Sequence, residues 1–128
     1  MTNPQSMARP TAAELDILNV LWANGPSTVR VVAEALNRQK RTGYTTVLKF
    51  MQIMAGKGLV VRDETQQAHV YRAAVSEQET RNRFVDDLAG RLFAGRPARL
   101  ALHALTAEQV SDQELEQIRA LLDARRGT

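Results

Sequence analysis

The stretch YTTVLKFMQIMAGKGLVV, residues 44–61, decides the fold of this chain. Its apolar side chains recur at steps of three and four residues, which places them on one face of an α-helix: Tyr44, Val47, Leu48, Met51 and Met54. The opposite face is polar and mostly short-chained, with Thr45, Thr46, Lys49 and Gln52. Gly58 stands where a left-handed residue would end the helix, and a β-branched strand follows at once. This pattern is typical of a DNA-reading helix followed by a wing, although an ordinary amphipathic helix before a hairpin shares it.

The composition excludes several classes of protein. At 128 residues the chain can form one ordinary domain or two small units that share a core. It has no cysteine, which excludes disulfides, zinc ribbons and thiol chemistry, and two histidines are too few for a usual transition-metal site. No apolar run approaches the roughly 18–20 residues of a membrane span, and residues 1–10 lack the apolar core of a signal peptide. We therefore expect a cytoplasmic protein with a disordered leader at 1–10, no membrane partner and no cofactor.

The charge is unevenly distributed along the chain. Residues 1–75 contain 9 Lys/Arg and 5 Asp/Glu, a net of +4, whereas residues 76–128 contain 8 and 9, a net of −1. Basic charge concentrated in one half favours a polyanionic partner for that half, although a small excess is also common on inert surfaces.

Residues 11–75 predict a winged helix–turn–helix. A capping box at Thr11–Glu14 opens a helix over 12–23, Ser27 is the expected N-cap of a helix over 28–37, and the helix at 44–57 follows a basic connection. Strands are expected at 59–63 and 68–73, joined by a turn at 64–67. The side chains expected to face the core of the first two helices are Leu15, Leu18, Leu21, Trp22, Val29, Val32, Ala33 and Leu36.

Residues 76–128 predict a helical dimerisation unit. Capping boxes at Ser76–Glu79 and Ser111–Glu114 open helices that run to about residues 94 and 124, with an apolar helix at 98–105 between them. Three helices of this size rarely bury enough apolar area alone, so we expect a second copy of the chain to cover their apolar faces. The alternative is that the helices fold back onto the winged helix of their own chain. The expected interface residues are Phe84, Leu88, Leu92, Leu100, Leu102, Leu105, Leu115, Ile118 and Leu122.

Five segments, in the same order and spacing, resemble the penicillinase repressors, the BlaI/MecI family that includes the CopY repressors. They are TAAELDILNVLW, STVRVVAEAL, YTTVLKFMQIMAGKGLV, VYRAAVSEQE and VSDQELEQIRALL, and the resemblance covers about residues 10–125. It implies a homodimeric winged-helix repressor whose C-terminal helices interlock. Each subunit would place its third helix in the major groove at one half of a palindromic operator on double-stranded DNA.

The resemblance also implies which residues approach DNA. By position, Thr45, Thr46, Leu48 and Lys49 would lie at the groove, with Thr42 and Tyr44 near the helix start, although helical periodicity turns Leu48 and Tyr44 inward. Thr hydroxyls bond phosphates or base edges, and the helix N-terminus favours a phosphate. To these residues the polar face adds Gln52, and the basic connection adds Arg38, Lys40 and Arg41 as backbone contacts.

The chain departs from the family pattern at several points. Ile53 stands where family members often carry Arg, and the wing tip 64–67 has Glu64 and no basic residue, so only Gln66, Gln67 and His69 are left as candidate wing contacts. Family members regulated by proteolysis are cleaved at an Asn-Phe pair; His103–Ala104 stands at that position. Copper sensing by a cysteine cluster is excluded. An upstream sensor or protease and the inducing signal are not identified by the sequence.

Other functions have less support in the sequence. The carboxylates at Asp86–Asp87 have no nearby histidine or phosphate loop, so we expect no enzyme and no catalytic residue. His103 is expected to be a core or interface histidine rather than a metal ligand or pH sensor. Two alternatives stay open: a winged helix that binds only proteins, and a repressor with a small-molecule effector between its two units.

Overall fold

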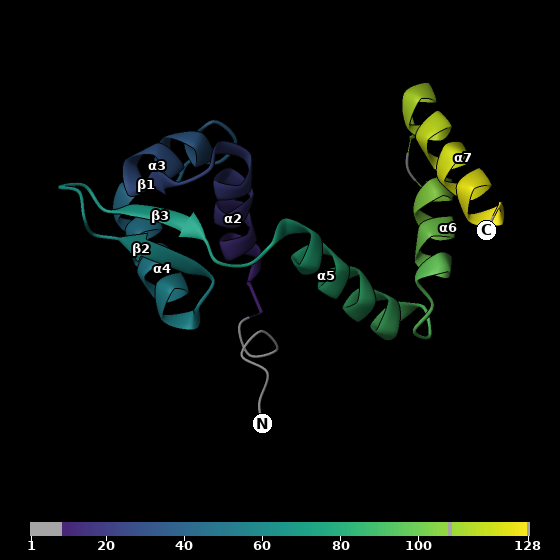
Figure 1. Cartoon of the computed structure of the whole chain (residues 1–128), viewed down its shortest axis with the longest axis horizontal. Coiled ribbons are helices and arrows are strands. Elements are labelled where there is room, and N and C mark those ends of the chain that lie inside the picture. Colours follow the sequence, from purple (N-terminus) through teal and green to yellow (C-terminus); the bar gives the residue numbers. More distant parts are fainter. Residues whose placement is uncertain (1–8, 108, 128) are drawn as a thin grey trace. The chain divides into compact units, whose positions relative to one another are not determined.

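The computed structural model describes residues 9–107 and 109–127. Its elements follow in the order α2 (Ala12–Asn24), β1 (Ser27–Thr28), α3 (Val29–Asn37), α4 (Tyr44–Lys57), β2 (Val60–Asp63), β3 (Val70–Ala73), α5 (Glu77–Leu92), α6 (Pro97–Ala107) and α7 (Asp112–Arg126) (Figure 1). They form two compact units, one ending at Thr80 and one beginning at Arg81. The predicted class, mainly helical with a small antiparallel sheet, is confirmed.

The sheet has three antiparallel strands in the order β1-β3-β2. β2 pairs with β3 from Val60↔Ala73 to Asp63↔Val70, which is the predicted hairpin with shorter strands and a longer connection. β1 was not predicted, and the expectation that Ser27 caps the second helix is wrong. Ser27 pairs with Tyr71 in the sheet and its hydroxyl donates to the Gly25 carbonyl at 2.9 Å. Because Ser27 is held in the extended strand β1, the helix begins one residue later than expected. Thr28 is the N-cap of α3, and its hydroxyl accepts the Val31 amide at 3.3 Å.

The first unit has a closed core. α2, α3 and α4 pack on one another, with β2 against α4 and β3 against α2 (Figure 1). Trp22, expected inside, is half-buried, and its indole Nε1 donates to the Val75 carbonyl at 3.0 Å. Leu15 is also only half-buried, and Ile17 takes the core position instead. The buried cluster comprises Ile17, Leu18, Leu21, Val29, Val32, Ala33, Val47, Met51, Met54, Leu59, Val60 and Tyr71.

The described residues of the second unit form no comparable core, and Ala89 is the buried hydrophobic residue among them. α7 contains no buried residue, although its predicted capping box is present: Ser111 Oγ accepts the Glu114 amide at 3.1 Å. α5 ends at Leu92, two residues earlier than expected, because Ala94 and Gly95 adopt left-handed backbone conformations with φ of 53° and 75°. In this turn the Gly95 amide donates to the Ala89 carbonyl at 2.9 Å, which stops the helix.

Most of the expected leader, residues 1–8, lies outside the described residues. Pro10, which was also assigned to the leader, is buried. Within the described ranges, no helix is both long enough and apolar enough to cross a membrane.

Candidate nucleic-acid interface

α4 is anchored by one face and open on the other, as predicted. Val47, Met51 and Met54 are fully buried and Leu48 is half-buried against the core. Thr45, Thr46, Lys49 and Gln52 are exposed. Tyr44 was expected on the anchored face, and this is wrong: 52% of the residue is exposed. It is the first residue of the helix, and the first α4 residue in the core is Val47, so the apolar spacing begins one turn before the core does.

The N-terminus of α4 is left open for an anion. Its N-cap is Gly43, which offers no side-chain acceptor, and its first turn has no acidic residue. α2 and α7, by contrast, begin with complete capping boxes. Uncapped amides and the helix dipole together favour a negatively charged group. Just before the cap, Asn37 Oδ1 accepts the Thr42 amide at 2.6 Å and the Thr42 hydroxyl donates to the Lys40 carbonyl at 3.1 Å, which orders the connection.

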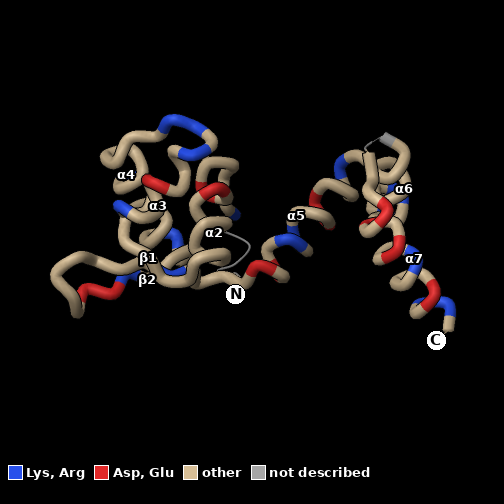
Figure 2. The backbone as a smooth tube through the Cα atoms, turned by 90° about the horizontal axis from the view of Figure 1, so that it is seen from above, with Lys and Arg blue, Asp and Glu red and all other residues tan. Residues whose placement is uncertain are grey.

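Four cations stand in the connection before α4 and in its second turn. Arg38, Lys40, Arg41 and Lys49 are exposed, and across the described part of the chain no ion pair engages them. The segment 35–62 contains six Lys or Arg and no Asp or Glu. Figure 2 shows this basic colour gathered on the connection between α3 and α4. Long-range attraction of a polyanion to this edge of the unit follows from the charges.

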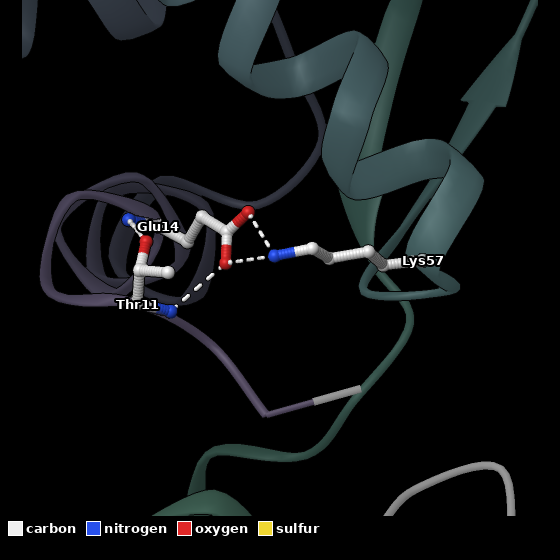
Figure 3. Close-up of polar contacts among 3 residues, drawn as sticks. All are labelled: Thr11, Glu14 and Lys57. Carbon is white, nitrogen blue, oxygen red and sulfur yellow. Dashed lines mark hydrogen bonds and ion pairs between the residues drawn. The ribbon is translucent and has the colours of Figure 1, made fainter. Parts of the chain in front are cut away.

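The far end of α4 is held by a pair that the sequence did not reveal (Figure 3). Lys57 Nζ donates to Glu14 Oε1 at 3.0 Å and to Oε2 at 2.9 Å. Glu14 is only 2% exposed and also completes the capping box, since its Oε1 accepts the Thr11 amide at 2.8 Å. Burial alone would raise the pKa of Glu14, but the hydrogen bonds from Thr11 and Lys57 and the Lys57 charge outweigh it and lower the pKa. Lys57 is therefore a structural link between α4 and α2 rather than a free cation.

The wing is held by its own acidic residues. Asp63 Oδ1 accepts the Thr65 amide at 2.9 Å and the Thr65 hydroxyl at 2.7 Å, and these two bonds lower the pKa of Asp63. Glu64 pairs with Arg62 at 2.8 Å, and His69 Nε2 lies 3.9 Å from the same carboxylate oxygen. β2 ends at Asp63, as predicted, and the connection is longer than the predicted 64–67 because β3 begins at Val70.

Three hollows show which candidate residues lie together. One, of about 460 Å³, brings Tyr44 and Leu48 beside Gln67 and His69 of the wing. A second, of about 320 Å³, is lined by the connection and α2 and includes Lys40, Arg41, Thr42 and Thr46. The third, of about 400 Å³, lies along the open face of α4 and is lined by Thr45, Thr46, Lys49, Phe50 and Ile53. Arg38 and Gln52 line none of the three.

The candidate dimerisation residues lie on partly or fully exposed surfaces of the second unit. Along α7, Leu115, Ile118 and Leu122 line one open face together with charged residues. His103 is exposed rather than in a core, and its ring centroid lies 5.7 Å from that of Phe93. The more exposed candidates are Leu88, Leu92, Leu102, Leu105, Leu115 and Leu122, whereas Phe84, Leu100 and Ile118 are half-buried.

Comparison with known proteins identifies the family. The sequence profile described as "Penicillinase repressor" matches residues 10–124, nearly the whole chain. The chain belongs to the penicillinase repressor family. The resemblance expected from the five sequence segments is thereby confirmed. Within the described residues of this family member, no group of three or more His, Asp or Glu could hold a metal ion.

Relatives within the penicillinase repressor family span most of the chain. The transcriptional regulator BlaI of Mycobacterium tuberculosis (strain ATCC 25618 / H37Rv) is 32% identical over 111 residues, covering 85% of this chain and 79% of the relative. The methicillin resistance regulatory protein MecI of Staphylococcus aureus (strain N315) is 20% identical over 113 residues, covering 88% and 92%. The solution structure of the DNA-binding domain of the repressor BlaI matches with a TM-score of 0.51 at 18% identity, over 62% of this chain and 93% of that domain. This last likeness establishes the shared winged-helix fold.

Proposed function

We propose that this penicillinase-repressor family member is a cytoplasmic, sequence-specific transcriptional repressor that binds double-stranded operator DNA as a homodimer. The observation that carries the proposal is the open face of α4, which presents Thr45, Thr46 and Lys49 after a connection whose cations form no ion pair with any described residue. α4 would enter the major groove, where hydroxyl and ammonium groups reach base edges.

The surroundings of α4 supply affinity without sequence information. Arg38, Lys40 and Arg41 would contact phosphates on both sides of the groove, and the uncapped amides after Gly43 would receive one phosphate. The Glu14–Lys57 pair would keep the helix at one angle to α2 while the cations are attracted to the backbone. Because the carboxylates of the wing repel phosphate, the wing would contribute less than α4.

The second unit would hold two winged helices at a fixed spacing. The open apolar face of α7 at Leu115, Ile118 and Leu122 supports this role, since a second copy of the chain would cover it. Two identical winged helices related by a two-fold axis would match a palindromic site whose half-sites lie about one turn of DNA apart. Repression would follow from occlusion of the promoter, and loss of the dimer would release it.

The first test is selection of bound duplexes from a random DNA pool at two salt concentrations. We expect an enriched palindrome that binds less tightly as salt rises, with a slope near −0.9 for each phosphate neutralised. Weak and equal binding to every sequence would contradict the proposal and favour a winged helix that binds only proteins.

Variants of the open face then locate the interface. Thr46→Ala and Lys49→Ala should each reduce operator affinity about tenfold with folding intact, because each removes one group from the groove. Arg99→Ala, which removes an exposed cation from α6, is the control and should bind as the unaltered chain does. If Thr46→Ala and Lys49→Ala bind the operator as tightly as the Arg99→Ala control and the unaltered chain, the DNA interface lies elsewhere.

A further inference from the structure

One side chain on the open face of α4 does not match its neighbours. Ile53 is 43% exposed, although Thr45, Thr46 and Lys49 beside it are polar. It lies one helical turn beyond Lys49 and two beyond Thr45, so these residues form one stripe along α4.

Ile53 lines a defined hollow and is not an isolated apolar residue on the surface. The hollow has a volume of about 400 Å³, and its lining residues include the apolar Phe50 and Ile53 together with Thr45, Thr46 and Lys49. Phe50 is half-buried and packs against the core. An isolated exposed isoleucine needs no explanation, but an exposed isoleucine beside a half-buried phenylalanine in a hollow on the open face of α4 does.

The charge around the hollow selects its occupant. Lys49 lines it, and Arg38, Lys40 and Arg41 stand in the connection before the same helix; among the residues that the structure describes, none of these cations forms an ion pair, although Asp16 lines a neighbouring hollow with Lys40 and Arg41. An apolar protein segment or a second copy of this chain would have to bury its contact among these cations. A group that is apolar itself but attached to a polyanion satisfies both features.

We propose that this hollow reads the C5-methyl group of thymine in the major groove, with Ile53 as the side chain that determines specificity. Among the four bases only thymine presents a methyl group on the major-groove edge, whereas adenine, guanine and cytosine present donors or acceptors there that an isoleucine would leave unpaired, and the C5–H of cytosine offers a smaller apolar contact. The inference rests on the proposed DNA-binding function. It predicts that one position of each operator half-site is a thymine.

A double-substitution experiment on protein and DNA tests the inference. In the operator recovered by selection, each thymine is replaced in turn by deoxyuridine, which removes only the methyl group. At one position in each half-site the unaltered chain should lose about fourfold in affinity for each methyl group, or about fifteenfold for a symmetric pair. Ile53→Ala should bind the thymine and deoxyuridine operators equally at that position, because the contact is already gone.

Val31→Ala is the matched control. Val31 is as exposed as Ile53, at 43%, but lies on α3 outside the hollow. This variant should keep the full discrimination between thymine and deoxyuridine. The comparison separates loss of the specific contact from a general effect of removing an exposed aliphatic side chain.

The remaining outcomes would overturn the inference in distinguishable ways. If the unaltered chain binds the operator and no deoxyuridine matters, or if Ile53→Ala keeps the discrimination, the hollow does not read thymine and the proposed function stands. If Ile53→Ala alters only the oligomeric state, a second copy of the chain covers the hollow. If the unaltered chain shows no specific DNA binding, both proposals fail.

Discussion

The two compact units of this chain differ in how far they bury their apolar side chains. In the first unit, twelve buried residues from three helices and the sheet form one cluster. In the second, Ala89 is the only buried hydrophobic residue among those described, and leucines of all three helices are exposed. The first unit is closed by its own chain, whereas the second presents apolar faces that association would cover.

The two units therefore differ in what their stability depends on. A helix pair or triplet of about 50 residues buries too small a fraction of its surface to be strongly stable alone. A second copy would supply the missing burial, so the stability of that unit would depend on protein concentration. The first unit has a closed core of its own and needs no such partner, so the open face of α4 stays available for a ligand.

The closed core provides the largest expected effect. Met51→Ala should reduce the free energy of unfolding of the first unit by about 2–5 kcal/mol, because it leaves a cavity among fully buried side chains. Denaturation monitored by Trp22 fluorescence measures it. Leu102→Ala, at a residue that is 65% exposed, is the comparison and should leave this transition unchanged. Equal losses from both substitutions would remove the distinction between the units.

The open face of the second unit should control assembly. Leu122→Glu places a charge on the α7 stripe, so the proposed dimer should dissociate at micromolar concentration and affinity for the proposed operator should fall about 100-fold through loss of bivalent binding. Sedimentation and titration of operator DNA measure the two effects. Gln117→Glu adds the same charge outside that face and is the control. A dimer that survives Leu122→Glu would assign the interface to other residues.

The two capping boxes offer a smaller and pH-dependent contrast. Glu14→Gln should cost about 1–3 kcal/mol of stability at neutral pH, because it removes the charge that Lys57 neutralises in a buried position. Since the pKa of Glu14 is lowered in the folded chain, this stability is present above the ordinary glutamate pKa of about 4.3 and is lost as the pH falls through the lower folded value.

Denaturation of both proteins from pH 7 to pH 3 tests this sign. The difference between the unaltered chain and Glu14→Gln should shrink below about pH 4.3. Glu114→Gln alters the corresponding box of α7, which is exposed and has no lysine partner, and should have a much smaller effect. A difference that grows on acidification would contradict the assigned pKa direction.

The smallest expected effect concerns the turn between α5 and α6. Ala94 has a φ of 53°, a conformation that costs a residue with a Cβ about 1 kcal/mol relative to glycine. Ala94→Gly should therefore stabilise the second unit by about 0.5–1 kcal/mol, measured on the dimer by thermal unfolding at fixed concentration. A destabilised Ala94→Gly dimer would mean that the methyl group packs in the assembled protein.

Periodicity and capping patterns predicted the elements well because these signals are local. The apolar spacing located α4 over residues 44–57, and both complete capping boxes, at Thr11 and Ser111, begin helices as expected. The open polar face of α4 follows from the same spacing. Local signals could not predict β1, because Ser27 extends only when Tyr71 of a distant strand pairs with it.

The helices, the hairpin, the polar face of α4 and the family could be predicted from the chain alone, because each depends on the order and spacing of residues. The position of Tyr44 outside the core and the pairing of Lys57 with Glu14 could be seen only in the folded protein. Glu14 falls on the buried stripe of α2 between apolar residues, yet its partner is 43 positions away. Contacts between distant segments depend on how helices pack, and the periodicity of one helix carries no information about its neighbour.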